Sequence, residues 1–190
     1  LFRSGRLQAS FWDPEKGYYR NGTYLGEKDI LSVGIAANSQ SDGVGTNLVK
    51  GNLNIWSVDL LVEKKLAGGF VPTFEAIYYK YNTGGIADCV ACGAGDNVGG
   101  QVQGKSYLVS GALLFPTKVG WGQFQPFIRH QNYDRDLART TNKATDFGLN
   151  YIINGFNAKV SAVYSKRDDS ALAPGLTGSK QFVVGVQLQY

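Results

Sequence analysis

Residues 181–190 read QFVVGVQLQY, and apolar side chains alternate with mostly polar or small ones along this stretch. The apolar series is Phe182, Val184, Val186, Leu188 and Tyr190. A β-strand has a side-chain period of two, so the stretch predicts a strand with one apolar face and one more polar face. Such a strand suits a wall between an apolar medium and water, although a soluble β-sandwich also contains strands of this kind.

The same alternation recurs about eight more times along the chain. Its apolar members are Leu7, Ala9 and Phe11; Leu31, Val33, Ile35 and Ala37; Trp56, Val58, Leu60 and Val62; Phe74, Ala76 and Tyr78; Tyr107, Val109, Gly111, Leu113 and Phe115; Phe124, Pro126 and Ile128; Leu149, Tyr151 and Ile153; and Phe156, Ala158, Val160, Ala162 and Tyr164. Asn154-Gly155 between the last two is a strong two-residue hairpin signal, because both residues tolerate positive φ. No segment predicts a helix, so we expect an all-β chain of about nine antiparallel strands.

The composition narrows the environment of this sheet. Hydrophobic residues make up 43% of the chain, yet no run approaches the roughly 20 apolar residues of a membrane helix. A transmembrane strand needs only about 9 to 11 residues, and 25 glycines with 13% aromatics suit many turns and aromatic girdles. The net charge of +4 is scattered and includes no long Lys/Arg run, so nucleic-acid binding has little support. We therefore interpret residues 1–190 as a single domain, an antiparallel transmembrane β-barrel.

The predicted links alternate in length, as in outer-membrane barrels with short periplasmic turns and longer external loops. The short links are residues 65–69, 116–120 and 154–155, and the long ones are residues 82–104, 134–143 and 168–180, with residues 41–51 of moderate length. Residues 13–29 are an exception, being too long for a periplasmic turn. Nine strands place Leu1 and Tyr190 on opposite sides, whereas single-chain bacterial barrels use even numbers, so we expect strands upstream of Leu1. A tenth strand at residues 18–25 would instead permit a small closed barrel.

The terminal alternation with its final aromatic resembles the signal by which outer-membrane barrels are recognised for insertion. Two further stretches resemble proteobacterial porins related to the phosphate-selective porin O and P group. They are residues 5–37, GRLQASFWDPEKGYYRNGTYLGEKDILSVGIAA, and residues 125–134, QPFIRHQNYD. Residues 82–104 show no such likeness. The resemblance implies a water-filled barrel of 16 or more strands, a homotrimer in the outer membrane of a Gram-negative bacterium, in contact with its lipid and lipopolysaccharide. This chain would then be roughly the carboxyl-terminal half, because sixteen spans of about 10 residues leave almost nothing for the loops.

Such a porin passes small hydrophilic solutes and ions by diffusion, and its selectivity depends on inward charges. The alternation places eight of them inward: Arg6, Asp59, Glu63, Glu75, Arg129, Asp146, Lys159 and Arg167. We predict that six line the pore, with an acidic patch of Asp59, Glu63 and Glu75 and a basic patch of Arg129, Lys159 and Arg167. Roughly 10 to 20 Å of wall separates the patches and would create a transverse field that tolerates small anions. The alternative is solvated charge without a selective role, and phosphate specificity is not implied.

Cys89 and Cys92 form the sequence CVAC inside the longest predicted loop. An exported, oxidising setting favours a disulfide that stiffens this loop, while reactive thiols or a metal shared between subunits remain alternatives. The motif lacks the ligand pairs of a zinc or haem site, so we expect no metal and no cofactor.

Catalysis has little support in this sequence. The single histidine, His130, falls on the outward face by alternation, and no G-x-S-x-G motif is present. The chain is therefore expected not to be an enzyme. Besides the porin, we keep a small closed barrel with a structural or adhesive role, because Leu108, Ala112, Leu114 and Ile152 give the inward face some apolar character.

Overall fold

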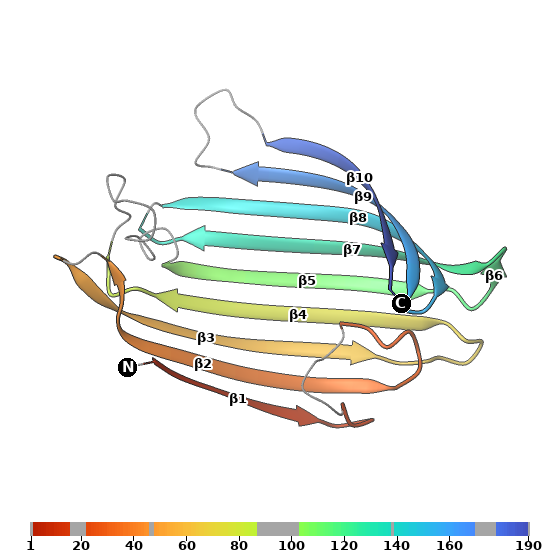
Figure 1. Cartoon of the computed structure of the whole chain (residues 1–190), viewed down its shortest axis with the longest axis horizontal. Helices are drawn as coiled ribbons and strands as arrows, with labels where there is room; N and C mark the ends of the chain where they lie inside the picture. Colours follow the sequence, from red (N-terminus) through yellow and green to blue (C-terminus); the bar gives the residue numbers. More distant parts are fainter. Residues whose placement is uncertain are drawn as a thin grey trace.

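The computed structural model describes residues 2–15, 22–45, 48–86, 103–137, 139–169 and 178–189. These residues form one antiparallel sheet of ten strands and contain no helix, so none of them forms an apolar helix able to cross a membrane (Figure 1). The strands are β1 (Phe2–Ser10), β2 (Ile30–Gly45), β3 (Lys50–Glu63), β4 (Val71–Asn82), β5 (Gly104–Leu114), β6 (Lys118–Val119), β7 (Gly122–Arg135), β8 (Thr140–Asn154), β9 (Ala158–Asp169) and β10 (Ser179–Leu188). The predicted all-β, antiparallel class is confirmed.

Strand order in the sheet follows the order along the chain. The path runs β1-β2-β3-β4-β5-β7-β8-β9-β10, and the two-residue β6 pairs only with β7 at one end. The nine strands of this path correspond to the nine alternating segments of the sequence. Among the described residues, β1 pairs only with β2 and β10 only with β9, so the sheet is open at both edges.

The links between strands lie at two ends of the sheet (Figure 1). We call the end with residues 64–70, 115–121 and 155–157 the turn end, and the end at which Gly45, Asn82, Arg135 and Asp169 terminate their strands the loop end. The expected loops at residues 41–51 and 134–143 are wrong in extent, because β2, β3, β7 and β8 continue for 14 to 16 residues each and leave links of only four residues. Strand pairing thus extends beyond the apolar stretch from which we predicted the strands.

The turn at Asn154 differs slightly from the two-residue hairpin that the sequence predicts. The Asn157 N–H donates to the Asn154 carbonyl at 2.8 Å, and Gly155 adopts φ +50°. The ladder between β8 and β9 shifts register between Ile152 and Asn154, which places three residues in the turn. Gly155 therefore supplies the left-handed conformation as expected, but within a bulged hairpin.

The register sorts the side chains onto two faces. One cross-strand row contains Ser32, Leu61, Glu75, Ser110, Arg129, Asp146, Ser165 and Gln181. The next row on the opposite side contains Leu31, Val62, Phe74, Gly111, Ile128, Phe147, Tyr164 and Phe182. We call the side of the first row the polar face and the side of the second the apolar face.

Large apolar side chains of the apolar face are exposed along the whole sheet. Ile35, Trp56, Phe147 and Val184, from four different strands, are between 45% and 61% exposed. Toward the loop end, the last apolar residue is aromatic in six strands, and polar residues follow it. These aromatic residues are Trp56, Tyr78, Tyr107, Phe147, Tyr164 and Phe182. The apolar face is thus a bounded band.

The described residues bury few apolar side chains. Val71, Leu114 and Ile152 form one cluster at the turn end, and Leu25 packs against it. Most apolar area of the sheet lies on the exposed face instead, which reverses the arrangement of a water-soluble domain, where a sheet buries its apolar face against a second layer.

Candidate functional site: the polar face

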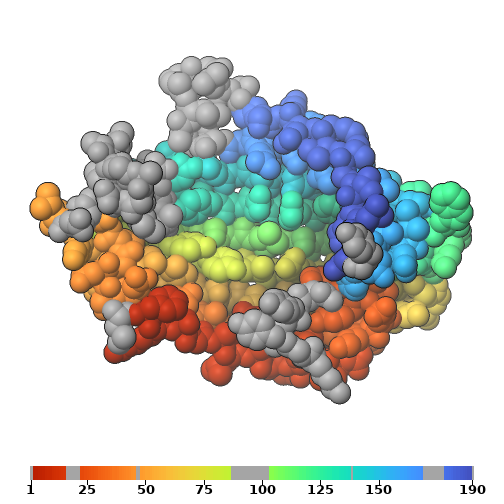
Figure 2. Space-filling view, viewed as in Figure 1, coloured from red at the N-terminus to blue at the C-terminus, as the bar shows by residue number. Residues whose placement is uncertain are grey.

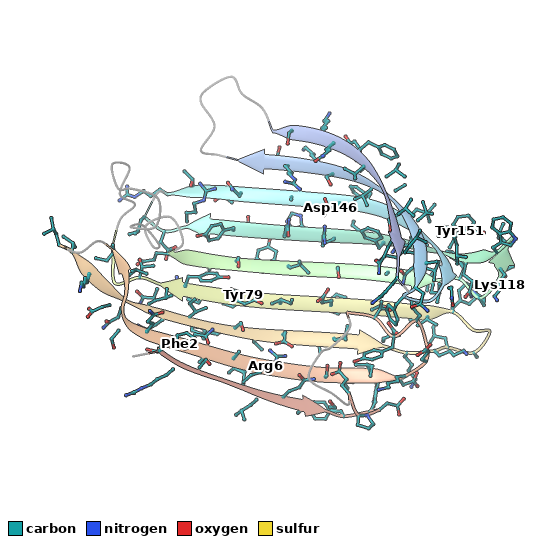
Figure 3. The ribbon with its side chains drawn as sticks, viewed as in Figure 1. Phe2, Arg6, Tyr79, Lys118, Asp146 and Tyr151 are labelled. Atoms are coloured by element: carbon teal, nitrogen blue, oxygen red, sulfur yellow. The ribbon has the colours of Figure 1, made fainter. Side chains whose placement is uncertain are left out.

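The polar face lies on the hollow side of the curved sheet, where residues 22–29 cross the inner surface (Figure 2). All eight inward charges predicted from the sequence lie on this face. Asp59 and Arg167 share one cross-strand row, Glu75, Arg129 and Asp146 share the next, and Glu63 lies one row closer to the turn end. Arg6 and Asp146 come from strands far apart in the sheet and are labelled in Figure 3. Whether these charges line a channel remains a prediction.

The first ion pair joins β1 to β3 across the intervening β2. Arg6 Nη1 and Nη2 donate to the two carboxylate oxygens of Asp59 at 2.6 and 2.7 Å. Both side chains pass over Gly34, where an added Cβ would lie 2.2 Å from Arg6 Nη2 and 2.6 Å from Asp59 Oδ2. The absence of a side chain at Gly34 therefore makes room for this bidentate pair.

The second ion pair joins neighbouring strands β7 and β8. Arg129 Nε and Nη2 donate to Asp146 Oδ2 at 2.8 and 2.6 Å. The Asp146 side chain is only 3% exposed, whereas that of Arg129 is 45% exposed. The buried Asp146 carboxylate thus has Arg129 as its ion-pair partner and also interacts with Ser165 and Arg167, while Arg129 also contacts solvent.

Glu63 is fully buried and holds a backbone segment rather than facing open space. Its carboxylate accepts hydrogen bonds from the Thr23 and Thr73 hydroxyls at 2.6 and 2.8 Å. The Tyr24 N–H donates to it at 3.0 Å and the Gly26 N–H at 2.9 Å. Residues 22–29 are thus fixed over the polar face at the turn end, which explains why the link from β1 to β2 is longer than a turn.

A second carboxylate ties the same segment to β1. Glu15 accepts hydrogen bonds from Gln8 Nε2 at 2.6 Å and from the Tyr24 hydroxyl at 2.8 Å. Leu25 takes φ +55°, which is uncommon for a residue with a side chain, and packs on the Val71, Leu114 and Ile152 cluster. The alternative of a tenth strand at residues 18–25 is not supported at residues 22–25, which form no strand, and residues 16–21 lie outside the described part.

These contacts revise the predicted division into an acidic and a basic patch. Asp59 is neutralised by Arg6 and Arg129 by Asp146, so each patch contains its own counter-charge. Glu75 accepts one long hydrogen bond, 3.3 Å, from the Ser110 hydroxyl. Lys159 and Arg167 have no ion-pair partner among the described residues. Both cations lie on β9, and Arg167 also interacts electrostatically with Asp146. The transverse field itself stays a prediction.

Toward the loop end the polar face carries an aromatic group that the sequence analysis did not assign to a site. Tyr79, Tyr81 and Tyr133 lie on this face, and Tyr79 is labelled in Figure 3. Burial raises the pKa of Tyr81 above its usual value and outweighs a hydrogen bond with Ser106. Continued alternation from Glu75 through Tyr79 to Tyr81 was the signal that would have revealed them.

The remaining predicted residues do not add chemistry to the polar face. His130 lies on the opposite face, as expected, and its Nδ1 is 2.8 Å from the Thr145 hydroxyl. Cys89 and Cys92 lie outside the described residues, so the disulfide stays a prediction. Within the described ranges, no group of three or more His, Cys, Asp or Glu side chains is arranged to hold a metal ion.

We compared the chain with models of protein families, with curated proteins and with solved structures, and none of them matches it.

Proposed function

We propose that this chain forms part of the wall of an outer-membrane porin, a water-filled β-barrel through which small hydrophilic solutes and ions diffuse. The observation that carries the proposal is the contrast between its faces. The apolar face is exposed across nine strands and bounded by aromatic residues, while the opposite, hollow face carries ion pairs, hydroxyls and amides. A barrel wall requires this arrangement, with lipid outside and water inside.

Exposing the apolar face to water would cost free energy, which supports a lipid environment for this face. Fully burying one large apolar side chain is worth about 1.5 to 3 kcal/mol, and Ile35, Phe147 and Val184 are only three of the many exposed ones. Monomeric soluble proteins rarely expose continuous apolar patches of this kind. The outer-membrane lipid and lipopolysaccharide would cover the band, and the aromatic residues at its edge would lie at the membrane interface.

The charges of the polar face support a channel that prefers anions to cations. Lys159 and Arg167 form no ion pair within the described residues, whereas the carboxylates of Asp59, Glu63 and Asp146 each accept hydrogen bonds. Residues 22–29 would narrow the turn end of such a channel. Kinship with the phosphate-selective porin O and P group, closure by further strands and a homotrimeric assembly belong to the same proposal.

Two neighbouring residues of β10 give a matched test of the membrane environment. Val184 lies on the apolar face and Gly185 on the polar face, where an added Cβ would meet nothing within 4 Å. Val184→Lys is expected to destabilise the protein folded into lipid vesicles by about 2 to 4 kcal/mol, and Gly185→Lys by far less. Equal effects of both variants would contradict a lipid-facing band.

Channel activity is tested directly by single-channel recording of the intact protein in planar lipid bilayers. We expect stepwise changes in conductance. Under a salt gradient, the reversal potential should indicate a higher permeability for anions than for cations. Lys159→Glu should move the reversal potential toward cations. Folded protein that inserts without conductance would contradict the channel.

A small closed barrel with a structural or adhesive role is the second candidate. The cluster of Leu25, Val71, Leu114 and Ile152 favours it, because these side chains fill the turn end. Absence of conductance in both the unmodified protein and a Glu63→Ala variant would support this candidate over the porin.

A further inference from the structure

An open cavity of about 890 Å³ lies at the loop end of the sheet, and tyrosines of the polar face contribute to its walls. Its polar-face lining includes Tyr79, Tyr81 and Tyr133, together with neutral polar side chains and one guanidinium group. Lys143 and Asp168, which face each other across β8 and β9, add one charge of each sign to the rest of the lining. Ligand sites of ~300 to 1,000 Å³ hold organic molecules of drug-like size, so this cavity is larger than a site for a single inorganic ion needs to be. None of the charges in the ion pairs of the polar face is required to build it.

The three rings form a continuous aromatic group. Tyr79 and Tyr81 have centroids 5.8 Å apart with planes inclined by only 18°, and Tyr133 lies edge-on to Tyr81 at 6.4 Å. On β5, between the strands that carry these rings, the same rows contain only Gly104 and Ser106. Because these two residues are small, they leave space between the tyrosines of β4 and β7.

Hydrogen-bonding groups surround the rings on β5, β7 and β8. Ser106, Gln131 and Asn142 bring a hydroxyl and two amides, which both donate and accept. A purely apolar ligand would leave these groups without partners, at about 1 to 3 kcal/mol for each buried one. The site therefore fits a ligand that has both apolar surfaces and several hydroxyl groups.

Arg167 adds a positive charge at the edge of the same cavity. Its side chain is exposed, and among the described side chains it has no carboxylate within ion-pair distance. A guanidinium group presents a planar fork of donors that matches a carboxylate. Arg135 lies on the same face, with its guanidinium carbon 5.7 Å from the centre of the Tyr133 ring.

From this combination we infer that the cavity is a binding subsite for an acidic carbohydrate, a sugar chain that carries carboxylate groups. The C–H faces of a pyranose ring would stack on the negatively polarised faces of Tyr79 and Tyr81. Sugar hydroxyls would exchange hydrogen bonds with Ser106, Gln131 and Asn142, and a carboxylate would meet Arg167. A small inorganic anion gains nothing from aromatic faces, and an aromatic acid leaves the amides to water.

The inference rests on the proposed channel for its role, because a solute would meet this subsite as it enters from the loop end. Binding itself is measurable without a channel. Isothermal titration calorimetry on the intact protein in detergent, with digalacturonate as the probe, gives the affinity. Block of single-channel current by digalacturonate gives the position in the pathway.

Four variants separate the parts of the site. Tyr79→Ala and Arg167→Gln are each expected to weaken digalacturonate binding about tenfold. Tyr78→Ala and Lys166→Gln are matched controls, because these residues are adjacent in sequence but lie on the apolar face, and they should leave the affinity within about twofold. Maltose, a neutral disaccharide, should bind more weakly than digalacturonate and should be insensitive to Arg167→Gln.

The binding and conductance measurements test the subsite and the porin proposal separately. Absence of digalacturonate binding, equal losses in the control variants, tighter binding of benzoate, or equal binding of maltose would each overturn the acidic-carbohydrate subsite. Conductance without digalacturonate binding would overturn this inference and leave the porin proposal intact. Binding without conductance would keep the subsite and contradict the porin proposal.

Discussion

The two ends of the polar face use the same alternating pattern for different purposes. At the turn end, Glu63 points inward and is fully buried beneath residues 22–29, where its carboxylate accepts hydrogen bonds from Thr23, Tyr24 and Gly26. At the loop end, Tyr79 and Tyr81 point inward from the next strand and border an open cavity. The difference shows that an inward position does not by itself define a pore-lining residue, because an inward carboxylate can equally anchor the chain.

Removing the Glu63 carboxylate should have the largest effect on this contrast. Glu63→Ala leaves the Tyr24 and Gly26 N–H groups without their acceptor, so the local free energy of opening should fall by about 3 kcal/mol. Hydrogen-exchange protection at these two amides would drop by about a hundredfold. Single-channel conductance should rise as residues 22–29 leave the turn end.

Glu75→Ala is the matched control for this change. Glu75 lies on the same face one strand further on, and its only hydrogen bond within the described part of the chain is the 3.3 Å contact with Ser110. Protection at Tyr24 and Gly26 should stay unchanged in this variant. Gly26→Ala provides an independent route to the same release, since Gly26 has φ +80° and an added Cβ would lie 2.6 Å from Val71. Unchanged protection in Glu63→Ala would show that other contacts hold the segment.

The Arg129–Asp146 pair lies on the polar face between the turn end and the loop end. Breaking it should have the next largest effect on the stability of the protein. Arg129→Gln leaves the buried Asp146 carboxylate without its ion-pair partner and should destabilise the protein by about 2 kcal/mol or more. Asp146→Asn should be milder, because Arg129 is 45% exposed and keeps its solvation. Denaturant unfolding from lipid vesicles measures both variants, and the reverse order would contradict the assigned burial.

The same pair also sharpens the electrostatic contrast. Asp146→Asn releases the positive charge of Arg129 toward the hollow side of the sheet, so reversal potentials should move toward anion selectivity. Arg129→Glu should move them toward cations. If both variants keep the original selectivity, the charges of the central row are solvated without a selective role.

Arg6→Gln should change stability by less than about 1 kcal/mol, although its ion pair with Asp59 is also bidentate. The side chains of Arg6 and Asp59 are 43% and 24% exposed, so water and salt screen their attraction. Unfolding at low and at high salt concentration distinguishes this pair from the buried one. A loss as large as that of Arg129→Gln would mean that Asp59 is effectively buried.

The smallest expected effect is a pH dependence at the loop end. Hydrogen bonds from Asn132 and Thr141 lower the pKa of Asp134, with nearby Lys105 and Lys143 adding to the shift. A lowered folded-state pKa gives stability that is present above the unfolded value of about 3.9 and is lost as pH falls through the folded value. Exchange protection at the β7 to β8 link should therefore weaken only below about pH 4. In Asp134→Asn this dependence should vanish.

The sequence predicted those parts of the fold that depend on side-chain alternation alone. The nine strands, the faces of the eight inward charges and the face of His130 followed from a period of two, as Glu75 and Arg129 illustrate. Link lengths were less predictable, because β7 and β8 continue past Ile128 and Phe147 with polar residues that carry no hydrophobic signal.

The contacts within the site depend on features that one sequence does not contain. The pairing of Arg6 with Asp59 requires the register of three strands and a glycine between them. The cage around Glu63 requires an irregular segment, residues 22–29, to fold back onto a wall more than 30 residues away. The predicted acidic and basic patches were therefore only partly informative, since the neutralising partners came from other strands.

The gap at Gly34 also bears on the open edge of the sheet. A one-residue slip of β1 against β2 would turn Arg6 to the apolar face and separate it from Asp59, two strands away. The ion pair thus favours one register of β1 relative to β3, and with it one register relative to the directly paired strand β2. A further strand that pairs with the other side of β1 would meet backbone N–H and carbonyl groups whose positions the ion pair has already fixed. The Arg6–Asp59 pair therefore also sets the register of that pairing.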